Sequence, residues 1–125
     1  MVHQTTFNIG LNNNPFSYET LAQFITNAIG RTNERVEIQL HDGTYVGNDE
    51  PTAVIRVIHK SEYQDSQWAE MMAQQLCITC TQECIPYRHS NDCTMAEKLV
   101  YHPQFDGDKY DFDGQYFIEF ADKVN

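Results

Sequence analysis

Hydrophobic and polar residues alternate in several short stretches of the chain, a pattern typical of strands with one buried face. The alternation runs over residues 2–11, where Phe7 and Ile9 share a face, and again over residues 35–41 and 52–59. The stretch 52–59 is richer in Val and Ile, so we expect it to lie more centrally in a sheet. We expect the strands 35–41 and 52–59 to pair with each other.

The connection between these two strands is residues 42–51. It contains the turn signals Asp42-Gly43 and Gly47-Asn48, and it ends at Pro51. Its length predicts a connection too long for a tight hairpin, with residues 44–46 able to extend the second strand past a bulge or turn.

Two other stretches repeat apolar residues at helical spacing. The first begins after Ser17, a good N-cap, and ends at Gly30, a residue that often follows a helix. Its apolar positions are Leu21, Phe24, Ile25, Ala28 and Ile29. The second begins after Ser61 or Asp65 and ends near Cys80. Its apolar stripe consists of Trp68, Met71, Met72, Ala73 and Leu76.

In the last third of the chain, the sequence pattern predicts shorter strands and turns. Residues 83–88 form a strand in which Pro86 cannot donate a hydrogen bond, so we expect this strand at an edge of the sheet. Residues 90–92 indicate a turn, and residues 98–102 a further strand. Residues 116–120 fit either a last strand or a short terminal helix.

The resulting order is strand, helix, strand, strand, helix, strand, which is the order of the ferredoxin-like split βαβ fold. We therefore expect an α+β two-layer sandwich, a single domain over residues 1–125, with an extra C-terminal strand or hairpin. A fold of this kind carries many unrelated functions, so function has to be argued from particular residues.

The net charge of the chain limits which classes of partner it can bind. The 125 residues include 18 Asp and Glu but only 8 Lys and Arg, which gives a formal net charge of −10. Such a chain repels nucleic-acid backbones and anionic lipid, so we expect no direct binding to nucleic acid and none to membranes. The sequence also shows no basic, apolar leader and no membrane-spanning run, which predicts a cytoplasmic protein.

Four cysteines fall within 17 residues and invite a metal interpretation. Thiolate and imidazole ligands suit tetrahedral zinc, and Cys77 and Cys80 have the spacing of one zinc hook. The candidate metal ligands are Cys77, Cys80, Cys84, His89 and Cys93. The alternative is that the thiols are buried as small hydrophobic groups around the end of the second helix. No other cofactor is indicated.

Five histidines fall mostly at the ends of predicted strands. In a split βαβ sheet the start of the first strand lies beside the end of the third, so His3 and His59 could meet. No third ligand or orienting carboxylate is indicated at strand or helical spacing, so we expect solvated histidines and assign none to catalysis.

The C-terminal stretch interleaves acidic and aromatic residues. Aromatic side chains supply contact area and carboxylates steer a basic partner, so this stretch is a candidate protein-binding surface. Its candidate residues are Asp106, Asp108, Tyr110, Asp111, Phe112 and Asp113. The alternative is a strand with its aromatic residues turned inward and its acids in water.

Three hypotheses on function follow. The first is a small acidic protein-binding module, in its strongest form a phage-type or mobile-element inhibitor that mimics nucleic acid and engages a basic, nucleic-acid-binding partner. The second is a zinc-binding structural domain. The third is a small enzyme with a site between the sheet and the connection 42–51. The sequence contains no phosphate-binding or hydrolase motif that would support this third hypothesis. We expect a non-enzyme, either a monomer or a homodimer.

Overall fold

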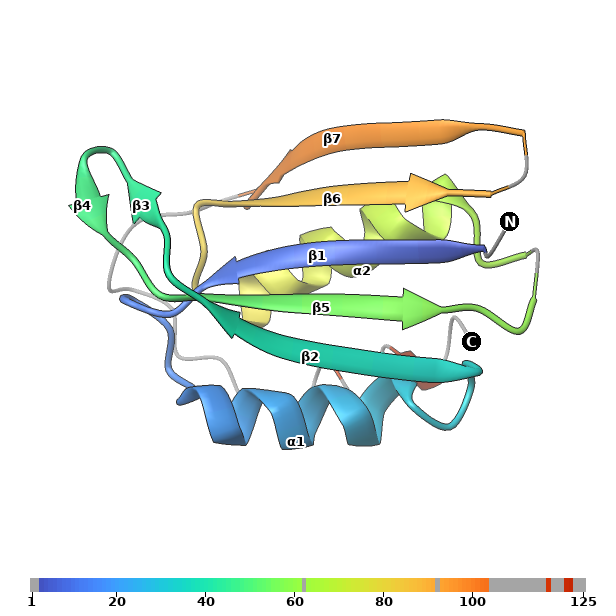
Figure 1. The fold of residues 1–125 in the computed structure, drawn as a ribbon, viewed down its shortest axis with the longest axis horizontal. Coiled ribbons are helices and arrows are strands. Elements are labelled where there is room, and N and C mark those ends of the chain that lie inside the picture. The colour runs from blue at the N-terminus through green and yellow to red at the C-terminus, as the bar shows by residue number, and fades with distance from the viewer. Residues whose placement is uncertain (1–2, 62, 92, 104–116, 118–120, 123–125) are drawn as a thin grey trace.

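The computed structural model describes residues 3–61, 63–91, 93–103, 117 and 121–122. Its main sheet has five antiparallel strands in the order β2-β5-β1-β6-β7. The strands are β1 (Gln4–Gly10), β2 (Arg35–His41), β5 (Thr52–Ile58), β6 (Cys84–Ser90) and β7 (Met95–Tyr101). The helices are α1 (Tyr18–Ile29) and α2 (Ser66–Thr79). In Figure 1, α2 lies behind β1 and β6, and α1 runs along the β2 side.

The predicted α+β sandwich is confirmed. Without β7, the strand order is that of the split βαβ fold, and β7 extends the sheet as the extra strand. The expected pairing of β2 with β5 runs along the full length of both strands, from Arg35 opposite Ile58 to His41 opposite Thr52. β5 lies between β2 and β1, which explains its richer content of branched apolar residues.

One face of the sheet packs against both helices to form the core. Alternate residues of each strand point to this face, so Phe7, Ile55 and Ile85 are fully buried while their neighbours are not. The helices contribute the side chains predicted from their spacing: Leu21, Phe24, Ile25, Ala28, Ile29, Trp68, Met72, Ala73 and Leu76. Met71 was expected in this stripe but is exposed, because its position turns away from the sheet.

Both helices begin at side chains that accept hydrogen bonds from otherwise unpaired N–H groups. Ser17 accepts from the Thr20 N–H at 3.3 Å. Asp65, not Ser61, caps α2 and accepts from the N–H groups of Gln67 and Trp68 at 3.0 and 3.1 Å. These caps fix where the helices start against the sheet.

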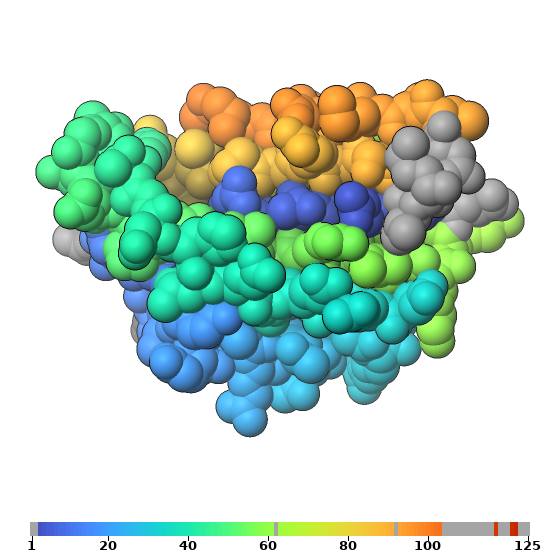
Figure 2. All heavy atoms as spheres, viewed as in Figure 1, coloured from blue at the N-terminus to red at the C-terminus, as the bar shows by residue number. Residues whose placement is uncertain are grey.

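Two local expectations are wrong. Residues 44–46 do not extend a strand of the main sheet, because β3 (Thr44–Tyr45) and β4 (Asn48–Asp49) pair with each other as a separate short hairpin inside the long connection. Val46 and Gly47 both adopt positive φ, as in a two-residue type I′ turn. Pro86 is not in an edge strand, since β6 lies between β1 and β7. Figure 2 shows the hairpin standing at one end of the sheet face turned to the viewer.

The sequence predicted a last strand or a short terminal helix near the C-terminus, and no membrane-spanning segment. In the segment 116–120, only Phe117 belongs to the described residues; it is helical and packs edge-on to Phe24 with ring centroids 5.3 Å apart.

Within the described part of the chain, neither helix has the length and apolar character needed to cross a bilayer.

Replacing Asp65 by Ala should lower the free energy of unfolding by about 1 kcal/mol, because two N–H groups of α2 lose their acceptor. Chemical denaturation measures the change. Asp42→Ala is the matched control, since Asp42 is an exposed acid outside the helices, and it should leave stability within about 0.5 kcal/mol of the parent. Equal effects of the two substitutions would contradict the capping role.

Candidate functional site

The face of the sheet opposite the helices carries a row of polar residues that crosses all five strands. The register places Glu37, Arg56, Thr6, Arg88 and Glu97 side by side in that order. Arg88 pairs with Glu97 through two nitrogens at 2.5 and 2.6 Å, and Arg56 lies 3.9 Å from Glu37. Each arginine of the row therefore lies beside a glutamate, although Glu37 is shared with Arg35, whose Nε is 3.3 Å from it.

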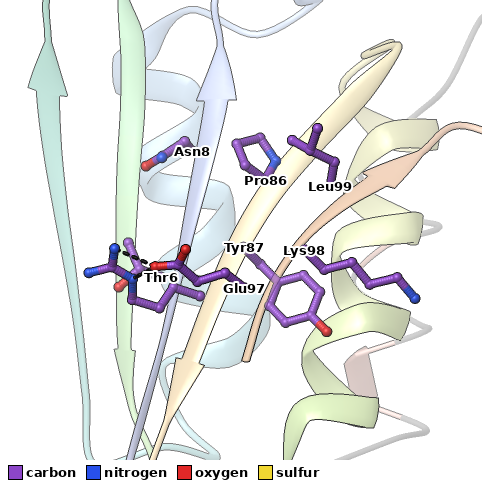
Figure 3. A pocket seen from close by; sticks show the side chains of 8 residues that line it. Thr6, Asn8, Pro86, Tyr87, Glu97, Lys98 and Leu99 are labelled. Carbon is purple, nitrogen blue, oxygen red and sulfur yellow. Dashed lines mark hydrogen bonds and ion pairs between the residues drawn. The ribbon is translucent and has the colours of Figure 1, made fainter. Parts of the chain in front are cut away.

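The same face is hollowed into two adjoining cavities of about 510 and 320 Å³, and three residues of the row, Thr6, Arg88 and Glu97, line the larger one. We call the two together the groove; Asn8, Pro86 and Leu99 line both cavities. Figure 3 shows these three side chains on one side of the larger cavity, with Thr6 and Glu97 nearby. Tyr87 and Lys98 point away toward α2, where Lys98 pairs with Glu70.

The groove lies where β1 and β6 stop pairing. Their ladder runs from Gln4 opposite Ser90 to Phe7 opposite Tyr87, and the next residue of β6 is Pro86, which has no N–H to donate. β1 continues as a strand to Gly10, but beyond Phe7 it pairs only with β5. The edge of β1 that faces β6 therefore becomes a wall of the smaller cavity.

The smaller cavity ends at an acidic cluster, which we define as Tyr45, Glu50 and Glu83. The Tyr45 hydroxyl donates a hydrogen bond to Glu83 Oε2 at 3.0 Å, which ties the hairpin to the start of β6. The backbone N–H of Glu50 donates to the Gly43 carbonyl at 2.7 Å. The hydrogen bond to Glu83, and then the charge of Glu83, raise the pKa of Tyr45 above its ordinary value.

The acidic cluster has no balancing cation among the residues that the structure describes. No Lys, Arg or His is among the described residues that line the smaller cavity, and no described ion pair involves Glu50 or Glu83. The pKa of the neighbouring Cys84 thiol is raised by burial and then by the charges of Glu83 and Glu50. This end of the groove is thus a site of negative potential, suited to a cationic ligand.

The predicted metal ligands are not gathered at one point. Cys77 and Cys80 are buried at the end of α2, where burial raises the pKa of each thiol to about 12. Cys84 begins β6, whereas exposed Cys93 follows the far end of that strand, and His89 turns toward other histidines. Among the described residues, no group of three or more His, Cys, Asp or Glu is placed to hold a metal ion.

The candidate partner-binding residues lie outside the described part of the chain. These residues are Asp106, Asp108, Tyr110, Asp111, Phe112 and Asp113. The residues of the acidic cluster, in contrast, were not singled out from the sequence, although the enzyme hypothesis pointed to the connection 42–51 that carries Tyr45 and Glu50.

The histidines at the strand ends form a buried hydrogen-bonded chain on the helix side of the sheet. His59 Nδ1 donates to the side-chain oxygens of Asn33 and Gln64, both at 2.9 Å. Its Nε2 lies 2.8 Å from the Thr5 hydroxyl, and Thr5 Oγ1 lies 2.7 Å from His89 Nδ1. His89 Nε2 lies 2.9 Å from Nε2 of His3. With a neutral His59 ring whose Nδ1 carries the proton, Thr5 donates to His59 and can accept from His89.

The prediction that His3 and His59 meet is confirmed, with ring centroids 5.3 Å apart. The prediction that such histidines are solvated is wrong, since His59 is 5% exposed and His89 2%. Burial lowers the pKa of His59 to about 4, against the hydrogen bond to Gln64, and lowers that of His89 as well. The chain of histidines is therefore a structural element of the fold, distant in the sheet from the acidic cluster.

Two solved structures resemble this fold. The structure described as phage SAM lyase in the apo state superposes with a TM-score of 0.63 and 14% sequence identity, and the match covers 84% of this chain and 93% of the other. Phage SAM lyase in complex with S-methyl-5′-thioadenosine gives a TM-score of 0.58 and 12% identity over the same shares. The chain matches no protein-family model, and no curated protein sequence matches it.

These matches contradict the first hypothesis on function. Both of these similar structures, which match over 84% of this chain, are those of an enzyme and not of an acidic protein-binding module or a nucleic-acid mimic. The expectation of an inhibitor rested on net charge and size alone, and neither property distinguishes an acidic inhibitor from an acidic enzyme.

Lowering the pH from about 6.5 toward 4 should destabilise the protein through His59. The pKa of His59 is about 4 in the fold, against 6.5 for an ordinary histidine. Between these pH values the unfolded chain therefore binds more protons than the folded protein, so stability falls as the pH is lowered. We expect a loss on the order of 2 kcal/mol. Urea denaturation at a series of pH values should show a shallower pH slope for His59→Gln, and an unchanged slope would contradict this account.

Proposed function

We propose that this chain is an enzyme that binds S-adenosylmethionine in the groove and releases S-methyl-5′-thioadenosine. The observation that carries the proposal is the unbalanced negative charge of the acidic cluster, Tyr45, Glu50 and Glu83, at one end of the groove. The fold likeness supports it, because one of the similar structures holds S-methyl-5′-thioadenosine.

The charges of the substrate fit the acidic cluster. S-adenosylmethionine carries a positive sulfonium, a positive ammonium group and one negative carboxylate, so it is a net cation, and the carboxylates of the cluster attract its two positive groups. Tyr45 adds an aromatic ring at the same place, and a cation over a ring face gains about 0.5–2 kcal/mol. The charged residues that line the larger cavity lack this property, since Arg88 and Glu97 form an ion pair and Lys98 pairs with Glu70.

The adenosine part of the substrate fits the rest of the groove. Pro86 and Leu99 offer an apolar surface for a flat base, and Leu99 is about half exposed. The Asn8 amide and the Thr6 hydroxyl supply hydrogen-bonding groups beside that surface. Cavities of about 510 and 320 Å³ lie in the ordinary range for small-molecule sites, which is roughly 300–1,000 Å³.

Release of S-methyl-5′-thioadenosine breaks the bond between sulfur and the amino-acid chain. The sulfur keeps the bonding electron pair and becomes a neutral thioether. The chain carbon completes its valence either through loss of a neighbouring proton or through a bond to the chain's own carboxylate. Because positive charge disappears from sulfur, the carboxylates favour the substrate over the transition state and the product, so they act mainly in substrate binding.

Four free cysteines are compatible with a reducing compartment. We therefore propose a cytoplasmic location for this activity, where S-adenosylmethionine would be met as a free small molecule.

Incubation of the purified protein with S-adenosylmethionine should produce S-methyl-5′-thioadenosine, which liquid chromatography separates from the substrate. Glu83→Gln should raise KM roughly tenfold and change kcat less, because it removes a charge that binds the ground state. Glu34→Gln is the matched control: Glu34 is exposed at the opposite end of the sheet, and its loss should leave both constants unchanged.

Mass spectrometry of the second product decides between proton loss and bond formation to the carboxylate. Folded protein that leaves the substrate intact would contradict the proposed function. Equal effects of Glu83→Gln and Glu34→Gln would show that general charge, and not the acidic cluster, binds the substrate.

A further inference from the structure

The end of β1 approaches the acidic cluster unusually closely. A Cβ atom built on Gly10 would lie 2.6 Å from Cδ of Glu50, closer still to its Oε1, and 3.0 Å from Oε1 of Gln82. Real side chains do not approach a Cβ atom this closely, so the Glu50 carboxylate occupies space that only glycine leaves free. Its position over β1 depends on the missing side chain at residue 10.

The backbone of Glu50 is fixed independently of this contact. Its N–H donates to the Gly43 carbonyl at 2.7 Å, and its carbonyl accepts from the Thr52 hydroxyl at 3.2 Å. The neighbouring chain is held as well, since the Asn12 amide donates to the Asp49 carbonyl at 2.9 Å. With the backbone held, an obstacle at residue 10 would displace the carboxylate rather than the loop.

We infer that Gly10 is a positioning residue that holds the Glu50 carboxylate over β1, and that the carboxylate so held makes the groove select a cationic sulfonium over the neutral thioether. The inference rests on the proposed function and identifies which group distinguishes substrate from product. A cation gains the attraction of Glu50, whereas S-methyl-5′-thioadenosine has no charge for it to attract. The selectivity would also favour product release once the sulfur loses its charge.

A pair of probes that differ in one methyl group and one charge isolates this effect. The first is S-methyl-5′-thioadenosine, and the second is its S-methylated sulfonium, which lacks the amino-acid chain and so cannot undergo the proposed cleavage. Isothermal titration of both probes gives the ratio of their dissociation constants. We expect the parent protein to bind the sulfonium roughly tenfold more tightly than the thioether.

Gly10→Ala and Glu50→Gln should each reduce this ratio severalfold. In the double variant, Gly10→Ala should cause no further reduction, because the group through which it acts has already lost its charge. A merely structural effect of Gly10→Ala would instead weaken both probes alike and leave the ratio unchanged. The variant should fold, since Gly10 does not have positive φ and the obstructing atoms are the ends of flexible side chains.

Glu50→Asp provides a second test that leaves β1 intact, because the shorter side chain withdraws the carboxylate without removing its charge. It too should reduce the ratio. An unchanged ratio in Gly10→Ala, with a reduced one in Glu50→Gln, would overturn the role of Gly10. Unchanged ratios in all the variants would overturn the role of Glu50. Failure of the parent protein to bind either probe would overturn the proposed function itself.

Discussion

The backbone hydrogen bond that Pro86 cannot donate shapes the face of the sheet that carries the groove. β1 and β6 pair as far as Phe7 and Tyr87, and the proline comes next. A residue with an N–H at this point could extend the ladder and close the sheet where the groove now lies. The interruption is tolerated inside the sheet because β1 remains paired with β5 and β6 with β7 through the same residues.

The charged side chains on the open face of the sheet fall into two groups, those that lie beside an opposite charge and those that do not. Arg56 and Arg88 each lie beside a glutamate, so the polar row has no net attraction for an ion. Glu50 and Glu83, at the hairpin end, have no such neighbour among the described residues. With a formal charge of −10, the chain would attract a cation most strongly where the negative charge is locally unbalanced. The proposed binding site depends on this local imbalance, whereas the net charge alone suggested a basic protein partner.

Much of the fold could be predicted from the sequence, because helices and strands with one buried face carry their periodicity in consecutive residues. Ser17 and Gly30 marked the ends of α1, and the limits of β2 were predicted to the residue. The strand that contains Pro86 was wrongly predicted at an edge, since a proline inside a sheet is tolerated only where tertiary structure ends the ladder. The short hairpin β3–β4 was not predicted, because Val46-Gly47 lacks the Asn-Gly or Asp-Gly pair that marks a type I′ turn in a sequence.

The candidate site was much less accessible to sequence reasoning. Glu50 and Glu83 lie on separate segments, and only the fold places both beside Gly10 in one cavity. No spacing rule links them, in contrast to Cys77 and Cys80, whose regular spacing suggested zinc and which are instead buried in the core. The nearest signal was the turn-rich connection 42–51, where the enzyme hypothesis placed its site without naming residues.

The most direct test of this account is to map S-methyl-5′-thioadenosine onto the protein by following backbone amide resonances during a titration. The account predicts saturable shifts at amides that line the groove, including Asn8, Gly10, Tyr45 and Cys84, and little change in α1 and α2. Shifts concentrated on the helices, or none at saturating concentrations of the nucleoside, would contradict the claim that the interruption at Pro86 forms a ligand site.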